Sequence, residues 1–478
     1  MHLRRVTPYY RPYRASFAGG LLLVLISTAI GSVIPWLLEK AIDAIRTSAP
    51  LSAVWKYSGI IVGSAVVGGA LRYLMREVIN GMSRRIEYDL RNDLFARLTR
   101  LDSGFYASMR TGDIMARLSN DLGAVRMAAG PAVMYLANTI CGGLFALLFM
   151  LRISPQLTLL ALIPLIMLPA ITMRMAKAIH DRFESVQEHF STLTTRAQEN
   201  LTGARIVRAY RQEAAEIERF GALNDEYLKR NMGLARLWGI MNPLFELFGG
   251  LGAAVVLLVG GMLALRGVIT IGEFVAFGLY LAMLTWPLIA LGWVVNLFQR
   301  GDASMGRLYE ILDARSTILV EEPVHRLPPA PGGRLIEFRD IGFHYPTPAG
   351  AEPRWVLRHV TFIARPGATV GIVGATASGK SALLDLLPRL HEAQEGDILV
   401  DGISIKLIPL NELRAEMGVV PQESLLFSDT IDSNLSYGAT TRDRGRVAAE
   451  TAQLSKTIAD FPGGFETILG ERGINLSG

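Results

Sequence analysis

The stretch Gly374-Ala-Thr-Ala-Ser-Gly-Lys-Ser381 decides the fold of the C-terminal third of this chain. It matches the pattern G-x-x-x-x-G-K-[ST], follows an apolar run at 369–373 and opens a helical pattern at 381–390. Strand, loop and helix in this order predict a phosphate loop, whose backbone N–H groups point at the phosphates of a nucleotide. Lys380 would then reach the β- and γ-phosphates, and the Ser381 hydroxyl would bind Mg²⁺.

The residues around the phosphate loop predict an α/β nucleotide-binding domain. Apolar runs typical of strands lie at 335–345, 356–364, 369–373, 397–400 and 418–421. Together with the helix after the phosphate loop, they indicate a domain over 335–478. A segment rich in Pro and Gly at 315–334 precedes this domain and is interpreted as a linker.

The N-terminal two thirds of the chain has the composition of a membrane domain. Half of the 478 residues are apolar and only 19% are charged, whereas soluble domains carry about 25% charged residues. A helix needs about 20 apolar residues to cross a bilayer. Residues 1–314 are therefore predicted to form an all-α transmembrane domain with six spans, at about 16–38, 57–79, 127–151, 156–176, 240–265 and 273–297.

The distribution of Lys and Arg orients these spans. The N-terminal tail and the two long connections, after spans two and four, are rich in Arg and Lys, and this excess marks the cytoplasmic side. Both termini are therefore expected inside, and the long connections should prolong the membrane helices into the cytoplasm, with tips at 105–112 and 206–213. The net charge of +5 then follows from topology and indicates no nucleic-acid partner. The single cysteine, Cys141, excludes an internal disulfide and a cysteine-based zinc site.

Over essentially its whole length the chain resembles the multidrug-type exporters of the ATP-binding-cassette superfamily. The resemblance is carried by 91–98, 111–121 and 199–210 in the membrane half and by the ordered nucleotide motifs in the other half. It implies a half-transporter of the bacterial inner membrane that dimerises with an identical or a homologous subunit. Such a dimer would use Mg²⁺ and ATP at two composite sites to export a drug, lipid or peptide by alternating access.

The resemblance also assigns roles to residues. Tyr345 would stack on adenine, Gln422 would contact Mg²⁺ together with Ser381, and Leu476-Ser-Gly478 would open the signature that faces the partner's ATP. The implied ATP-binding residues are Tyr345, Gly374, Ala375, Thr376, Ala377, Ser378, Gly379, Lys380, Ser381, Ala382 and Gln422, with Ser477 and Gly478 in the signature.

Three departures from the family pattern carry expectations. The water-activating Glu of the Walker B strand and the switch His would follow the signature, but the sequence ends at Gly478. We therefore expect a fragment of a longer protein without catalytic residues, which does not hydrolyse ATP at a normal rate. Ala377 replaces a glycine, which is acceptable if its φ is negative. Ala382 replaces a second hydroxyl and removes one possible bond to the α-phosphate.

Two polar residues in span five, Asn242 and Glu246, are candidates for the substrate cavity. An ionisable group at membrane depth is by default a functional candidate, although Glu246 near the cytoplasmic end of its span is more readily explained by a bond to a neighbouring helix than by contact with a substrate or proton. Trp286 and Trp293 are interpreted as an interfacial belt rather than as a cavity lining.

Two other functions remain open from the sequence. Ala377, Ala382 and the missing C-terminal motifs fit a regulatory subunit that binds ATP without hydrolysing it. The same architecture also fits an ATP-gated channel. No residue names the transported molecule.

Overall fold

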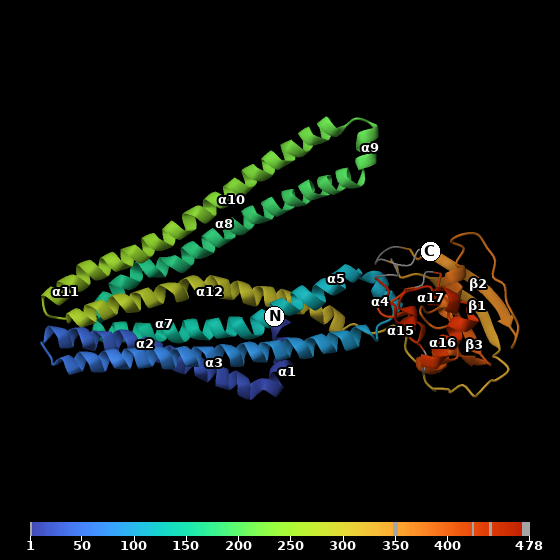
Figure 1. Ribbon diagram of the computed structural model, residues 1–478, viewed down its shortest axis with the longest axis horizontal. Helices are drawn as coiled ribbons and strands as arrows, with labels where there is room; N and C mark the ends of the chain where they lie inside the picture. The colour runs from blue at the N-terminus through green and yellow to red at the C-terminus, as the bar shows by residue number, and fades with distance from the viewer. Residues whose placement is uncertain (1, 348–351, 423–424, 439–441, 471–478) are drawn as a thin grey trace. The chain divides into compact units, whose positions relative to one another are not determined.

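The computed structural model describes residues 2–347, 352–422, 425–438 and 442–470 (Figure 1). The chain divides into two compact units, Met1–Ser316 and Thr317–Gly478. We call them the membrane unit and the ATP unit.

The membrane unit is helical throughout. It begins with a short helical segment made of η1 (His2–Val6), α1 (Thr7–Tyr10) and η2 (Arg11–Tyr13). Its longer elements are α2 (Arg14–Arg46), α3 (Leu51–Leu98), α7 (Val133–Ile153), α8 (Pro155–Thr202), α10 (Glu213–Val255) and α12 (Ile271–Leu312). Short elements join them: α4 (Ser103–Ser108), α5 (Thr111–Ala116), η3 (Arg117–Asp121), α6 (Leu122–Met127), η4 (Ala128–Ala132), α9 (Ala204–Ala209), η5 (Val256–Gly260) and α11 (Gly261–Leu265).

Apolar helical segments occur at each of the predicted spans. Among the described residues, four continuous helices are long and apolar enough to cross a membrane: His2–Arg46, Leu51–Leu98, Thr111–Ile153 and Glu213–Leu265. Two further helices begin with shorter apolar segments, Pro155–Met167 and Ile271–Leu284. The prediction of a helical membrane domain followed by a smaller domain with a sheet is thus confirmed.

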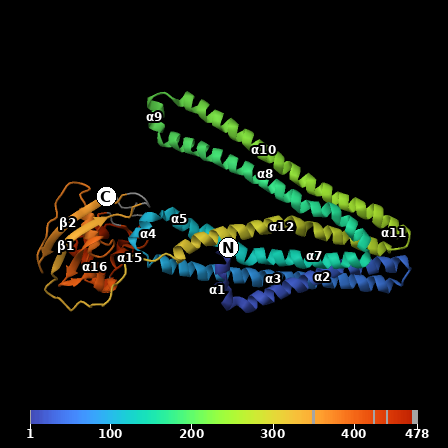
Figure 2. The same ribbon diagram turned by 180° about the vertical axis from the view of Figure 1, so that it is seen from behind.

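The long helices reach well beyond a bilayer. With 48 residues, α3 is about 72 Å long at 1.5 Å per residue, more than twice the hydrocarbon thickness of about 30 Å. In both views α2, α3, α7 and α12 run side by side, while α8 and α10 form a separate antiparallel hairpin closed by α9 (Figures 1 and 2). Short helices α4, α5 and α9 therefore occupy the two predicted tips.

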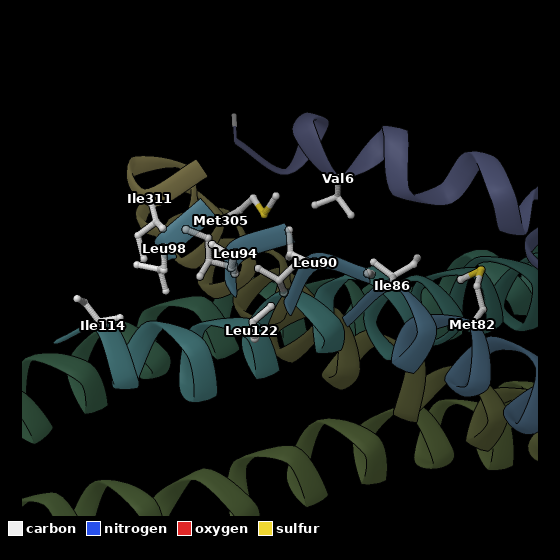
Figure 3. Close-up of a cluster of buried hydrophobic side chains, with 13 residues drawn as sticks. Val6, Met82, Ile86, Leu90, Leu94, Leu98, Ile114, Leu122, Met305 and Ile311 are labelled. Carbon is white, nitrogen blue, oxygen red and sulfur yellow. The ribbon is translucent and has the colours of Figure 1, made fainter. Parts of the chain in front are cut away.

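A cluster of buried apolar side chains lies where α3, α6 and α12 meet beyond the predicted spans (Figure 3). Leu90, Leu94 and Leu98 follow each other at helical spacing on α3 and are all buried. They pack with Leu122 and with Met305 of α12. Burial of each large side chain contributes about 1.5–3 kcal/mol, so the cluster keeps these extensions helical without lipid around them.

Polar contacts fix α12 at both ends. At its N-terminus Asp43 of α2 accepts bonds from the Thr270 hydroxyl (2.8 Å) and the Gly272 N–H (3.0 Å). Towards its other end, the buried carboxylate of Asp121 accepts bonds from the Ser304 hydroxyl (2.9 Å) and Arg307 Nε (2.8 Å). The two contacts connect α12 to α2 and to η3, in the first long connection between predicted spans.

The ATP unit contains one antiparallel sheet with short helices. The strands β1 (Ile336–His344), β2 (Trp355–Ala364), β3 (Glu395–Val400) and β4 (Ile403–Ser404) are ordered β2-β1-β3-β4. Its helical elements are α13 (Lys380–Leu386), η6 (Ile405–Leu407), α14 (Leu410–Ala415), α15 (Ile431–Leu435), α16 (Arg442–Thr451), α17 (Ser455–Ala459) and η7 (Gly464–Glu466). The buried side chains of α13 belong to the same apolar core as those of β1 and β3.

Part of the predicted linker is attached to the ATP unit. The N–H of Glu321 donates to the Lys406 carbonyl, and the N–H of His325 donates to the Leu407 carbonyl, both at 2.9 Å. The buried Arg389 donates to the carbonyl of Leu319 at 2.8 Å.

Two predicted strands and one helix boundary are wrong in the structure. No strand forms at 369–373 or 418–421, because neither segment has a hydrogen-bonded neighbour among the described residues. Val373 and Val420 are accordingly 94% and 95% exposed. The helix after the phosphate loop ends at Leu386 instead of residue 390, since Pro388 has no N–H to continue the helical hydrogen bonds and Arg389 has a positive φ of 51°.

Candidate nucleotide-binding site

The phosphate loop directly precedes α13, and glycine is required at its end. Gly379 has φ +92° and caps the N-terminus of α13. A Cβ atom at this position would lie 2.8 Å from Cδ2 of Leu357 and 3.1 Å from Cγ1 of Val356. Both the backbone conformation and the close approach to β2 therefore exclude a side chain there.

Ala377 does not satisfy the condition set for it from the sequence. Its φ is +66°, in the left-handed region that costs a residue with a Cβ about 1–2 kcal/mol. The loop bends back between Gly374 and Gly379, and Ala377 adopts this conformation within the bend. The alanine is accommodated with strain, not without it.

Lys380 and Ser381 stand at the start of α13, where phosphates would bind. The Lys380 ammonium donates to the carbonyls of Gly374 (2.9 Å) and Ala375 (2.8 Å). These bonds hold the Lys380 ammonium over the loop, where it could donate to a phosphate oxygen. Ser381 is exposed at the same end of the helix. Ala382, by contrast, is buried against the sheet core, so its methyl group serves packing.

A pocket of about 900 Å³ is lined by predicted ATP-binding residues from three different segments of the chain. It is lined by Tyr345 at the end of β1, by 376–382 and by Gln422. The Tyr345 ring is set by edge contacts with the rings of Phe343 (5.0 Å) and His391 (5.4 Å) and stays 45% exposed. An exposed ring in a fixed orientation is suited to stack on a base.

The donors of this pocket fit Mg²⁺ bound together with phosphates. The Ser381 hydroxyl and the Gln422 side-chain carbonyl are hard oxygen donors, which Mg²⁺ prefers. Among the described residues no group of three or more His, Cys, Asp or Glu side chains forms a separate metal cage. Mg²⁺ is commonly held by one or two protein ligands plus substrate phosphates, so this small donor set is sufficient.

Sequence reasoning missed part of the pocket wall. Thr347, Glu352, Arg354, Trp355 and Val356 also line it. These residues reach the pocket through the pairing of two strands, which the sequence does not reveal. Trp355 at the start of β2 pairs with His344, the residue before Tyr345. The ring of Trp355 is held by the edge of His344 at 5.1 Å and by the Arg358 guanidinium at 4.9 Å.

The remaining predicted site residues do not line this pocket, and among them Gly374 and Ala375 contact Lys380 through their carbonyls. Ser477 and Gly478 lie outside the described residues, as does the side chain of Asn242. Glu246 is exposed on α10, so its place in a substrate cavity stays a prediction. Trp293 packs edge-on against Tyr135 of α7 with ring centres 4.9 Å apart, whereas the side chain of Trp286 is outside the described residues.

Comparisons with known proteins agree with both halves of this description. The family model of the ABC transporter transmembrane region matches residues 17–288, and the ABC transporter model matches residues 357–478. The "Probable multidrug resistance ABC transporter ATP-binding/permease protein YheI" of Bacillus subtilis is 33% identical over 483 residues, which cover 100% of this chain and 81% of that protein.

Two further relatives are similar over the same extent. The "Multidrug resistance-like ATP-binding protein MdlA" of Escherichia coli is 33% identical, over 98% of this chain and 79% of that protein. The "ATP-dependent lipid A-core flippase" of Syntrophus aciditrophicus is 31% identical, over 99% of this chain and 78% of that protein. The similarity thus runs through the membrane unit and the ATP unit alike.

Proposed function

Because this chain belongs to the ABC transporter family, with a transmembrane region and an ATP-binding region in one polypeptide, we propose that it is one half of an exporter. The exporter would pair two such subunits and move a small or amphipathic molecule, a drug or a lipid, out of the cytoplasm. The names of the relatives support this substrate range, since two are named for multidrug resistance and one for lipid A-core.

One observation carries the proposal. The phosphate loop, Tyr345 and Gln422 line the same pocket in a chain whose other unit has helices long and apolar enough to span a membrane. A nucleotide pocket without spanning helices would fit a soluble enzyme, and spanning helices without the pocket would fit a passive pore. Their fusion in one chain supports transport driven by ATP.

The pocket residues would divide the work as follows. Tyr345 would stack on the adenine, Lys380 would bind the terminal phosphates in place of the loop carbonyls, and Ser381 and Gln422 would hold Mg²⁺, which when bound would neutralise phosphate charge. For ATP to drive a change of access in the membrane unit, it must bind the closed pair of ATP units more tightly than the open pair.

Exposed apolar side chains support the pairing of two subunits. Leu201, Ile206, Tyr210 and Ile217, around α9, are 66–80% exposed. They belong to the cytoplasmic end of the α8–α10 hairpin, where lipid does not cover them. Clustered apolar surface outside the membrane marks a contact with another protein, and we assign this contact to the second subunit.

A regulatory ATP-binding subunit is the second candidate, and Ala377 favours it. The left-handed φ of Ala377 places strain in the loop that holds the phosphates, and strain at this point fits a site that binds ATP without efficient turnover. The partner would then be a homologous chain with an unstrained loop.

Drug-hypersensitive bacteria that express the native gene test the export proposal. We expect resistance to at least one amphipathic drug, and its loss on Lys380→Ala, because the substitution removes the charge that binds the phosphates. Lys456→Ala, an exposed lysine of α17 outside the pocket, is the control and should keep resistance. Equal resistance with Lys380→Ala would contradict a function driven by this pocket.

A further inference from the structure

Two arginines and one glutamate are exposed within the predicted membrane spans, on two helices that do not meet. Arg72 and Arg76 are on α3, within the second predicted span, and Glu246 is on α10, within the fifth. All three are exposed. Glu77 and Arg174 are also exposed within predicted spans. Among the described residues, Arg72, Arg76 and Glu246 form no ion pair. The Arg72 guanidinium donates a hydrogen bond to the carbonyl of Gly68. A charge left without a partner at membrane depth is costly.

The two arginines share one face of α3. Residues four apart lie above each other on a helix, so Arg72 and Arg76 form a single cationic strip. Glu77 is one residue further along and points to a different side. This strip lies beside the face that packs in the bundle, which includes Met75 and Ile79.

Contacts inside the membrane unit give the depth of these charges. Gly252 of α10 approaches Leu281 of α12, and the neighbouring Tyr280 donates to the carbonyl of Ser32 on α2 at 2.9 Å. Two residues from Ser32, Ile30 approaches Gly68 of α3. These contacts provide a common level from which positions on α10 and α3 are counted.

Counted from that level, Glu246 and the arginine strip have the same depth. Glu246 precedes Gly252 by six residues, which places it about 9 Å from the level of Ser32 towards the cytoplasmic end of the span, at 1.5 Å per residue. Arg72 and Arg76 follow Gly68 on α3 by four and eight residues, and Ile30 precedes Ser32 by two, so the two arginines lie about 9 Å and 15 Å from the same level in the same direction. The carboxylate is thus within about one helical turn of both guanidinium groups in depth.

The opposite charges do not meet within one chain. α10 packs against α8 and α12, whereas α3 packs against α2 and α6. In both views α12 and α7 lie between α10 and α3 (Figures 1 and 2). Arg174 of α8 is the nearest cation on the hairpin by position, about four residues further towards the cytoplasm, and it forms no ion pair with Glu246 in the described structure.

We propose that Glu246 forms an ion pair across the dimer with Arg72 of the partner subunit, with Arg76 of the partner subunit beside it. The partner is a second copy of this chain, because one copy offers the cationic strip and the anionic position on two different surfaces. A twofold axis then forms the contact twice, as an isologous interface requires. The inference rests on the proposed pairing of subunits and specifies which helices meet.

Cysteine cross-linking in the full chain tests the contact. Cys141 is the only native cysteine, so a Cys141→Ala background carries Glu246→Cys together with Arg72→Cys. In nanodiscs, a short bifunctional maleimide should convert most of this variant into a covalent dimer. The control pairs Glu246→Cys with Leu74→Cys, because Leu74 is exposed, lies between the two arginines in depth and faces another side of α3.

A charge swap separates contact from mere proximity. Glu246→Lys alone should raise the dissociation constant of the dimer about tenfold or more, because it opposes like charges at a close contact. Combining Glu246→Lys with Arg72→Glu and Arg76→Glu should restore it. The native mass of the untreated protein reports the dimer independently.

The outcomes separate this inference from the proposed function. A native dimer whose Arg72 pair links no better than the Leu74 pair overturns the ion pair and leaves the pairing of subunits standing. A link within a single chain also overturns it. A protein that is monomeric by native mass under all conditions contradicts both the ion pair and the dimer.

Discussion

The Tyr345 ring is the part of the pocket whose contribution can be isolated most cleanly. Stacking between a base and an aromatic side chain is worth about 1–3 kcal/mol. We expect Tyr345→Ala to weaken ATP binding about 5- to 150-fold, and Tyr345→Phe to keep binding within about threefold, since the ring remains. Equilibrium titration with Mg-ATP measures both.

A matched control exists for this substitution. Tyr437 belongs to the same unit, is 75% exposed and stacks on Phe427, but does not line the pocket. Tyr437→Ala should leave ATP affinity unchanged. A loss of affinity as large as that of Tyr345→Ala would contradict base stacking at Tyr345.

Ala377 provides a test of backbone strain. Ala377 has a φ of +66°, so replacing it with glycine should remove about 1–2 kcal/mol of backbone strain from the folded state. This gain offsets the loss of about 0.4–1 kcal/mol that glycine causes by raising the conformational entropy of the unfolded chain. Ala377→Gly should therefore leave the thermal midpoint unchanged or raise it. Ala375→Gly, in the same loop and without a positive φ, should lower the midpoint. Equal losses at both positions would show that Ala377 is unstrained.

At the scale of elements, the contact between the first long connection and α12 depends on Asp121. Burial alone raises the pKa of this carboxyl, but the bonds from Arg307 and Ser304 outweigh it and hold the pKa below the ordinary value of 3.8. A carboxyl with a lowered folded-state pKa stabilises the fold at neutral pH, and the contribution is lost as the pH falls below about 4.

Removing that charge should destabilise the junction. We expect Asp121→Asn to cost about 1–2 kcal/mol, seen as a lower thermal midpoint at pH 7, with the difference from the native chain shrinking as the pH falls towards 3. Asp181→Asn on α8, where the carboxylate is exposed, is the control. A pH-independent difference would assign the effect of Asp121→Asn to packing rather than to charge.

The elements differ in how far the sequence predicts them. Apolar length predicts α2, α3, α7 and α10 because a spanning helix satisfies all of its backbone groups internally. The runs at 369–373 and 418–421 look equally apolar, but a strand also needs a neighbour, which local sequence does not supply. The nucleotide motif likewise gives Lys380 and Ser381, whereas Trp355 enters the pocket only through the pairing of β1 with β2.

At the scale of the whole molecule, one chain has features that the proposed second subunit would complete. The hairpin of α8 and α10 exposes apolar side chains around α9 and a carboxylate, Glu246, within the fifth predicted span. The pocket of the ATP unit belongs to a chain that also carries helices long and apolar enough to span a membrane. In the proposed dimer, each hairpin would be covered by the other subunit, and two ATP pockets would serve one transport pathway.

Transport against a gradient tests the central claim most directly. Inside-out vesicles containing the native gene product would receive Mg-ATP and an amphipathic fluorescent dye at equal concentrations inside and outside. We predict that the dye accumulates in the vesicles. Lys380→Ala should abolish this accumulation, and Lys456→Ala should retain it. Dye that only equilibrates with ATP present would indicate an ATP-gated channel. If the protein binds ATP but moves neither the dye nor a labelled lipid in an ATP-dependent way, the exporter is contradicted and the regulatory subunit is favoured.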